Sequence, residues 1–436
     1  MSEHCGYVVR VENLRPHSNA DRLQIATFFG NDTCVGLDVV QGEIGIYFPS
    51  DLQLSVEFCD ENHMCRKRAD GTDDTGYLDR DKRNIRPIKL RGEKSDGIFV
   101  PLSAVVYTGV NLDELNIGDK VEMLNGHEIC CKYIPKITKT TKINIQIQKS
   151  KIKSTRIDFP YFVQHIDTPQ LRFNQDLFKE GDYICLTEKV HGTSTRHGNS
   201  LSISYKKNLF DKIFKRKGKE KKEYKYITGT RRTIVSDISG GYYGSNQFRV
   251  DWGGKINNKL REGEELFGEI AGFISPYNPI MSICDNRKTK DKNFIKTYGN
   301  TTTFSYGCNE KLGNNRLFVY RMTYTDSKGF VFEYPWDYVK VRAEQMGLET
   351  VPELERFIYT DQEDFMKHIE KYMDISSTLD NRHIIEGVVV RKLNAPNGFV
   401  VAKEKSFNFK VLESIIKIDA EMPDIEEMED CLKNGV

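Results

Sequence analysis

The chain has few features of a secreted or membrane protein. Its ten cysteines include no CxxC pair, which favours reduced thiols over a disulfide framework. No apolar run approaches the roughly 20 residues that a membrane-spanning helix needs. The start, MSEHCGYVVR, lacks the apolar core of a signal peptide. We therefore expect a soluble, cytoplasmic protein that does not use a membrane.

An overall excess of charge is also absent. The formal net charge is +1 although 29% of residues are charged, so attraction to a polyanion must come from local clusters. Two basic clusters occur. Residues 131–156 contain eight basic residues and no acid, and residues 205–226 contain ten basic residues and three acids. Either a phosphate-contact surface or a solvated loop explains the second cluster.

A chain of 436 residues predicts two or three domains. Residues 1–125 contain short β-rich runs such as GEIGIYF and GIFVPL, which predict an all-β module. Within it, PHSNADRLQIATFFG resembles the opening of OB-type tRNA-binding domains, which predicts an OB-type barrel that binds nucleic acid. We expect a basic linker at 126–158, an α+β domain at 159–415 with helical spacing in 337–373, and an acidic tail at 416–436.

Two lysines lie in similar short motifs. Lys189 occurs in TEKVHGTS and Lys94 in GEKSDGI. A lysine that attacks a nucleotide phosphate needs groups nearby that absorb the charge of the phosphates, and it needs a means of holding the base. Such groups follow Lys189 in order, whereas none follows Lys94 before the second β-rich region begins. We therefore predict that Lys189 is the nucleophile and that Lys94 marks a turn, with Asp96 and Gly97 supplying the turn geometry.

The groups that follow Lys189 each suit one task at a nucleotide. TGTRRTI and AKEKSFNFK supply cations for phosphate or ribose, LFGEIAG supplies an acid at a strand end, and RLFVYRM supplies aromatic side chains for stacking on a base. In IIEGVVVRK an acid stands in an apolar strand, where it is costly without a cation partner. The residues are Arg231 and Arg232 in TGTRRTI, Lys403, Lys405 and Lys410 in AKEKSFNFK, Glu269 in LFGEIAG, Phe318 and Tyr320 in RLFVYRM, and Glu386 in IIEGVVVRK.

These blocks resemble motifs I, III, IIIa, IV and V of the covalent nucleotidyltransferases, which are DNA ligases, RNA ligases and mRNA capping enzymes. EKVHG, with His191 where the usual motif has Asp, resembles the phage-type second branch of RNA ligases. IYFPSDLQLSVEF and IRPIKLRGEKSDGIFVPL resemble RNA ligases with an OB domain ahead of the catalytic domain. Only 26 residues follow Lys410, too few for the OB domain that DNA ligases and capping enzymes carry there.

The resemblance implies an ATP-dependent RNA ligase whose adenylyltransferase domain is built of antiparallel sheets. Lys189 would take AMP from ATP, pass it to an RNA 5′-phosphate, and allow a 3′-OH to displace it, as in RNA repair. Mg²⁺ or Mn²⁺ would be held by Glu386, with Glu269 behind it, and Glu188, His191 and Gly192 would join the nucleotide site. His191 accepts hydrogen bonds from metal-bound water less well than Asp does.

Several alternatives remain open from the sequence alone. A guanylyltransferase that uses GTP, and a non-catalytic RNA-binding protein on a transferase scaffold, share the same motif order. The RNA partner is equally open between a nicked duplex, a broken hairpin and free single-stranded ends.

Overall fold

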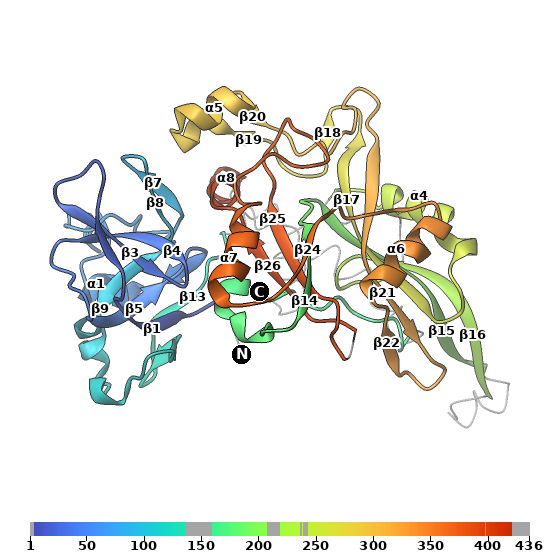
Figure 1. Ribbon diagram of the computed structural model, residues 1–436, viewed down its shortest axis with the longest axis horizontal. Coiled ribbons are helices and arrows are strands. Elements are labelled where there is room, and N and C mark those ends of the chain that lie inside the picture. The colour runs from blue at the N-terminus through green and yellow to red at the C-terminus, as the bar shows by residue number, and fades with distance from the viewer. Residues whose placement is uncertain are drawn as a thin grey trace. The chain divides into compact units, whose positions relative to one another are not determined.

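The computed structural model describes residues 4–135, 159–206, 219–235, 238, 243–396 and 398–420. The chain forms two compact units (Figure 1). Unit 1 comprises Met1–Lys136, Asp285–Asn300 and Phe407–Met422, and unit 2 comprises Ile137–Cys284, Thr301–Ser406 and Pro423–Val436. Most of the predicted basic linker, the centre of the second basic cluster and the end of the acidic tail lie outside the described residues.

Unit 1 is mainly β-structure. A four-stranded sheet has the order β10-β1-β5-β9 and a three-stranded sheet the order β2-β3-β4, beside the pairs β6–β13, β7–β8 and β11–β12. The strands are β1 (Gly6–Arg10), β2 (Leu14–Pro16), β3 (Leu23–Phe28), β4 (Asn31–Gly36), β5 (Ile44–Phe48), β6 (Leu52–Leu54), β7 (Ile88–Leu90), β8 (Glu93–Ser95), β9 (Ile98–Pro101), β10 (Lys120–Val121), β11 (Met123–Leu124), β12 (His127–Glu128) and β13 (Cys130–Lys132).

Short helices complete unit 1, so the expectation of an all-β module was too simple. They are α1 (Val56–Glu61), α5 (Lys292–Tyr298) and α8 (Phe407–Ala420), with 3-10 helices η1 (Leu102–Thr108), η2 (Leu112–Glu114) and η6 (Asn286–Thr289). Helix α1 begins where the Ser55 hydroxyl accepts a hydrogen bond from Phe58 N, and Phe58 is fully buried.

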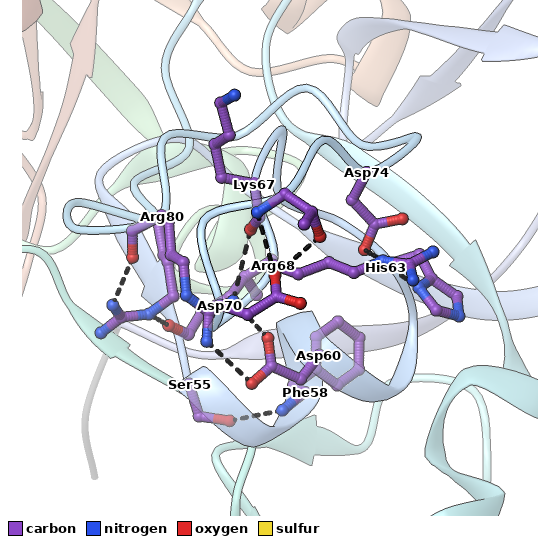
Figure 2. A network of polar contacts seen from close by, with 12 residues as sticks. Ser55, Phe58, Asp60, His63, Lys67, Arg68, Asp70, Asp74 and Arg80 are labelled. Atoms are coloured by element: carbon purple, nitrogen blue, oxygen red, sulfur yellow. Dashed lines mark hydrogen bonds and ion pairs between the residues drawn. The ribbon is translucent and has the colours of Figure 1, made fainter.

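The loop after α1 is held by ion pairs (Figure 2). Arg80 contacts Asp60 through both of its terminal nitrogens, and His63 Nδ1 lies 3.1 Å from Asp74 Oδ2. Each pair joins one exposed partner, His63 or Asp60, to a less exposed one, Asp74 or Arg80, so each pair contributes little to stability by itself. Together they link the end of α1 to residues 74 and 80 of the loop.

Unit 2 contains two antiparallel sheets. The larger has the order β16-β15-β17-β21-β22, with β18 beside β17 and β23 parallel to β21; the smaller has the order β24-β14-β25-β26. The strands are β14 (Tyr183–Glu188), β15 (Thr193–Lys206), β16 (Lys219–Gly229), β17 (Glu264–Ser275), β18 (Asn278–Pro279), β20 (Thr301–Thr302), β21 (Asn315–Thr325), β22 (Val331–Glu333), β23 (Glu349–Thr350), β24 (Glu353–Ile358), β25 (Gly387–Lys392) and β26 (Val401–Lys405). Strand β19 (Cys284–Asp285) spans the boundary between the units.

The helices of unit 2 are α4 (Gln247–Ile256), α6 (Trp336–Gln345) and α7 (Gln362–Glu370), with 3-10 helices η3 (Leu171–Phe173), η4 (Gln175–Leu177) and η5 (Asn257–Lys259). The helical spacing of 337–373 is confirmed by α6 and α7, although β23 and β24 lie between them. Phe365 and Ile369 of α7 share a core with Ile184 and Val388, so α7 covers one face of the smaller sheet. Because strand side chains alternate, Thr187, Val389 and Arg391 face the other side.

The mixed α+β class with mostly antiparallel sheets is confirmed. One stretch was wrongly interpreted as strand throughout: GFVVAKEKSFNFKV turns from β26 to helix α8 at Phe407. Phe409, Leu412 and Ile415 are all buried, a spacing of three residues that fits a helix and not a strand.

Among the described residues, no helix is both long and apolar enough to cross a membrane.

Candidate active site

Lys189 follows the last residue of β14 and stands beside β25. Its backbone N–H donates to the carbonyl of Gly387 at 2.9 Å, which holds the residue at the edge of the smaller sheet. Its Nζ lies 2.8 Å from Oε1 of Glu386, and the lysine side chain is 26% exposed whereas the glutamate is 2% exposed. The ammonium therefore contacts a buried carboxylate while the lysine side chain keeps partial access to solvent.

Glu386 is the acid that lies in an apolar strand of the sequence, and basic side chains surround its carboxylate. Besides Lys189, Nζ of Lys405 lies 3.8 Å from Oε1 and Nδ1 of His191 lies 3.8 Å from Oε2. Within the described residues Oε2 is buried and accepts no hydrogen bond. A buried carboxylate oxygen without a donor has an open coordination position, which fits a metal ion or a metal-bound water.

The described residues contain no group of three His, Cys, Asp or Glu side chains that would enclose a metal ion. Glu269, on β17, is partly exposed, and its Oε2 accepts from the hydroxyl of Ser194 at 3.2 Å. A metal held here would rely on one carboxylate together with water and substrate phosphates, which is the usual arrangement for Mg²⁺.

Lys403 and Lys405 lie on β26, opposite Val389 and Gly387 of β25. As residues two apart in a strand they face the same side of the sheet, as expected from the sequence. Lys403 N also donates to the carbonyl of Pro169 at 2.8 Å, which ties the strand to the segment HIDTPQL.

The carboxylate of Glu188, the residue before Lys189, accepts hydrogen bonds from the loop at residues 377–378. It accepts from the hydroxyl of Ser377 at 2.5 Å and from the backbone N–H of Thr378 at 2.9 Å. Burial raises the pKa of Glu188, while these hydrogen bonds oppose the rise. Its carboxylate therefore anchors this loop.

His191 and Gly192 form a tightly packed turn. The backbone N–H of His191 donates to the hydroxyl of Tyr306 at 2.6 Å, and the His191 ring packs edge-on against Phe304 with centroids 4.7 Å apart. A Cβ on Gly192 would lie 2.3 Å from the carbonyl oxygen of Ile270, so no larger residue fits. The glycine lets the turn that precedes β15 lie directly against β17.

Tyr306 is fully buried between these groups. Burial, together with the nearby carboxylates of Glu386 and Glu188, raises the pKa of its phenol well above the ordinary value. The neutral hydroxyl is therefore a hydrogen-bond donor or acceptor at all ordinary pH values. The stretch FSYGC that contains Tyr306 has no periodicity and no motif, so sequence reasoning missed it.

The two aromatic residues of β21 differ in environment. Phe318 is fully buried, with the Arg316 guanidinium 4.8 Å from its ring centroid. The ladder between β17 and β21 shifts register at Phe267 and Gly268, and Tyr320 lies in that bulge. Its hydroxyl contacts Nδ1 of His165 at 3.2 Å.

Tyr320 lines a small pocket whose wall also includes residues of α6 and β25. Arg391 of β25 lines it as well, and its guanidinium lies 4.4 Å from the ring centroid of Trp336 and donates from Nε to the Thr187 hydroxyl at 3.1 Å. Burial lowers the pKa of Arg391 to about 10. The motif analysis did not select Arg391, because it stands five residues after Glu386 in a run of apolar residues.

Arg231 and Arg232 share one acidic partner. Their Nη2 atoms lie 2.6 Å and 3.3 Å from the carboxylate oxygens of Asp167. Although burial opposes ionisation of Asp167, Arg231 and then Arg232 keep its pKa below the ordinary value. The TRRT block is thus joined to the segment HIDTPQL, residues 165–171.

Lys410 lies on α8 in unit 1, and the strand argument that set it apart from Lys403 and Lys405 does not apply to a helix. Its Nζ lies 2.6 Å from Oδ2 of Asp96, with exposed fractions of 19% and 4%. Asp96 belongs to KSDG, and Lys94 of the same motif is in β8, 5.3 Å from the Phe407 ring centroid.

Comparison with known proteins gives one family and one set of structures. The RNA ligase family model matches residues 182–412. No curated protein sequence matches the chain.

Among solved structures, a lysine-to-alanine mutant of Naegleria gruberi RNA ligase with ATP and Mn is similar at 16% identity and a TM-score of 0.55, covering 93% of this chain and 98% of that chain. An apo lysine-to-alanine mutant gives 17% identity, a TM-score of 0.57 and coverage of 94% and 98%. The Naegleria gruberi enzyme with PPi gives 15%, 0.55, 94% and 98%. At these identities the similarity shows a shared fold.

Proposed function

The chain belongs to the RNA ligase family, and from this premise we propose that it is an ATP-dependent ligase that seals RNA 3′-OH and 5′-phosphate ends in RNA repair. Lys189 is the nucleophile. Its nitrogen attacks the α-phosphorus of ATP, the bond to pyrophosphate breaks, and loss of a proton leaves lysyl-AMP. An RNA 5′-phosphate then displaces the lysine and takes AMP, and a 3′-OH attacks that phosphate and releases AMP.

The contact of Lys189 with Glu386 is the observation that carries the proposal. A lysine 2.8 Å from a buried carboxylate, with a second lysine 3.8 Å from the same oxygen, gathers two cations around one acid. Such a site is balanced only when anionic phosphate enters, and Lys405, with Lys403 on the same face, is placed to bind it.

A divalent cation, Mg²⁺ or Mn²⁺, fits Oε2 of Glu386, the buried oxygen that accepts no hydrogen bond among the described residues. The ion would offset the charge that accumulates on the α-phosphate and the leaving pyrophosphate. His191 presents Nδ1 on the same side, 3.8 Å from Oε2. As a neutral imidazole it would orient water at the ion and would not replace the acid. Two of the similar Naegleria gruberi structures contain ATP or AMP with Mn.

The pocket beside Tyr320 suits the base. Arg391 stands four residues along β25 from Gly387, or about 13 Å in a strand. That separation suits an extended nucleotide whose phosphates reach Lys189 while its base lies at Tyr320. Phe318 supports this wall from the core, and Glu269, with Ser194, would contact the ribose between the two ends. Glu188 and Gly192 shape the turn at Lys189, and Arg231 and Arg232 border the entrance with Asp167.

Residues 1–125 would form an OB-type domain that binds RNA, and 159–415 the adenylyltransferase domain. Supporting this, β1, β5, β9 and β10 form one antiparallel sheet and β2 to β4 another, although the two are not joined in one closed ladder among the described residues. We expect adenylate transfer to need ATP and metal alone, and sealing to need both RNA ends held in line as well.

Labelled ATP and labelled GTP, supplied separately, test the proposal. We expect acid-labile, base-stable label from ATP on the wild type and on Lys94→Ala, and none on Lys189→Ala. Equal label from GTP would favour a guanylyltransferase. RNA binding without label from either nucleotide would favour a non-catalytic RNA-binding protein. Full labelling of Lys189→Ala would refute the assignment of the nucleophile.

A further inference from the structure

Unit 1 carries a concentration of positive charge that the proposed chemistry does not use. Residues 86–94, which include the β7–β8 hairpin, hold four basic residues and one acid. Residues 285–300, which include η6 and α5, hold five basic residues and two acids. These 25 residues carry a net charge of +6, whereas the whole chain carries +1. The rest of the chain is therefore net acidic, and the positive charge is local.

The two segments touch although about two hundred residues separate them. Nζ of Lys89 on β7 pairs with the carboxylate of Asp291, and the side chains are 26% and 16% exposed. The same carboxylate caps α5, because its Oδ1 accepts from the backbone N–H groups of Asn293 and Phe294 at 3.0 Å. Asp291 is thus shared by a lysine and a helix N-terminus, which leaves little of its charge for other cations nearby.

Like charges face each other on the hairpin. Lys89 stands directly opposite Lys94 in the β7–β8 register, where Cβ atoms are about 5 Å apart and equal charges destabilise the pairing. Lys290 and Lys292 flank Asp291 in sequence and are exposed. The region therefore gathers more cations than its own acids neutralise.

Two of these cations sit at turns that ordinarily favour other residues. Arg91, at φ 46°, and Gly92, at φ 100°, form the two-residue turn between β7 and β8, and Lys290 ends η6 at φ 58°. A non-glycine residue in this left-handed conformation is strained, and Gly, Asn and Asp are the residues that usually occupy it. Long basic side chains at both turn tips point to a role for their charge.

We propose that the basic face, defined as Arg86, Arg91, Lys94, Lys290, Lys292 and Lys296, binds the phosphate backbone of the RNA substrate. The partner is a polyanion because the cations are spread over a hairpin and a helix and do not enclose a small pocket. All six are exposed: Arg91 and Lys290 at the two turns, Lys292 and Lys296 on α5, Arg86 just before β7, and Lys94 on β8 beside Phe407. The inference rests on the proposed function, since RNA is the substrate of that reaction.

Binding through phosphate contacts depends on the charge of the RNA backbone and not on the base sequence. Each phosphate neutralised releases a counterion, so affinity falls with salt by a slope of about 0.9 per contact on duplex and about 0.7 on single strands. The basic face is therefore expected to supply a salt-dependent, sequence-independent share of the affinity for RNA.

The test compares two full-length variants that each remove three lysine charges. The first variant combines Lys290→Asn, Lys292→Gln and Lys296→Gln, which removes the charges of the basic face that lie within residues 285–300. Asn is used at position 290 because it suits the left-handed backbone there. Lys311→Gln, Lys328→Gln and Lys367→Gln are the control, because these lysines are exposed and lie in unit 2. Fluorescence anisotropy with one labelled nicked RNA duplex, repeated over a range of KCl concentrations, gives affinity and salt slope.

We expect the first variant to bind about tenfold more weakly at moderate salt and to show a slope shallower by about 2 to 3, while the control stays within about twofold of wild type. Wild-type affinity in the first variant, or an equal loss in both variants, would overturn the proposal. Lysyl-AMP formation from ATP without RNA should be unchanged in both. If the wild type forms no lysyl-AMP, the proposed function fails, and the anisotropy result still decides the basic face.

Discussion

Lys410→Met tests whether Lys410 serves the catalytic site or unit 1. In the structure Nζ of Lys410 lies 2.6 Å from Oδ2 of Asp96, and the lysine and aspartate side chains are 19% and 4% exposed. Methionine keeps the length and apolar stem of lysine but removes the charge. The carboxylate of Asp96 would then stay buried without its cation.

The size of the effect follows from that burial. Exposed ion pairs contribute about 0.2 to 1 kcal/mol, and removing one partner of a fully buried pair costs about 3 to 5 kcal/mol. With one side chain buried and the other partly exposed, we expect a loss of about 2 kcal/mol. For a unit of this size that corresponds to a decrease in Tm of roughly 4 to 8 °C.

Differential scanning calorimetry and adenylylation measured on the same preparation separate the two roles. Unit 1 should unfold at lower temperature in Lys410→Met, and the Tm should recover in part in the double variant Lys410→Met, Asp96→Asn. Lysyl-AMP should form at nearly the wild-type rate when assayed well below the transition. An unchanged Tm with lost adenylylation would refute this reasoning and return Lys410 to the phosphate site.

Three further changes probe unit 2. Glu386→Gln keeps the shape of the side chain, so we expect folding as in the wild type but at least about a 100-fold loss of lysyl-AMP formation, and normal labelling would contradict the role of Glu386. Burial raises the pKa of Glu265 to about 8, above its value of about 4.3 in the unfolded chain, so its contribution to stability is full below about pH 4 and is lost as the pH rises through 8. Glu265→Gln should therefore make Tm fall less steeply between pH 5 and 9, and parallel pH profiles for the two proteins would count against it. Gly192→Ala places a Cβ 2.3 Å from the Ile270 carbonyl, so a soluble variant with wild-type Tm would show that the strands are not packed this closely.

The link between Lys189 and Glu386 was predictable from sequence because a charge in an apolar strand requires a partner. The lysine motif and the acid motif are both local patterns, and β14 and β25 are neighbours in the sheet. The antiparallel α+β character was also predictable from local patterns, because the period-two pattern of strands and the period-3.6 pattern of helices can be recognised within short segments of sequence.

Long-range contacts without a charge signature were not predictable. The hydrogen bond from His191 N to the Tyr306 hydroxyl joins residues 115 apart, and nothing in FSYGC indicates it. The interpretation of the residues after Ser406 as strand failed for a different reason. The strand pattern runs directly into a helix in which Phe409, Leu412 and Ile415 are buried at every third residue. Over so few residues, the change from the period of a strand to that of a helix could not be recognised.

The three-segment construction of unit 1 limits how this protein could be divided or inherited. The front of the chain shares its compact body with 285–300 and with α8, and both of these are reached only through strands of unit 2. A gene fusion that added or removed residues 1–136 as one cassette would leave α5 and α8 with uncovered surfaces. The front region is therefore not an exchangeable module, and its sequence must change in step with two distant parts of the chain.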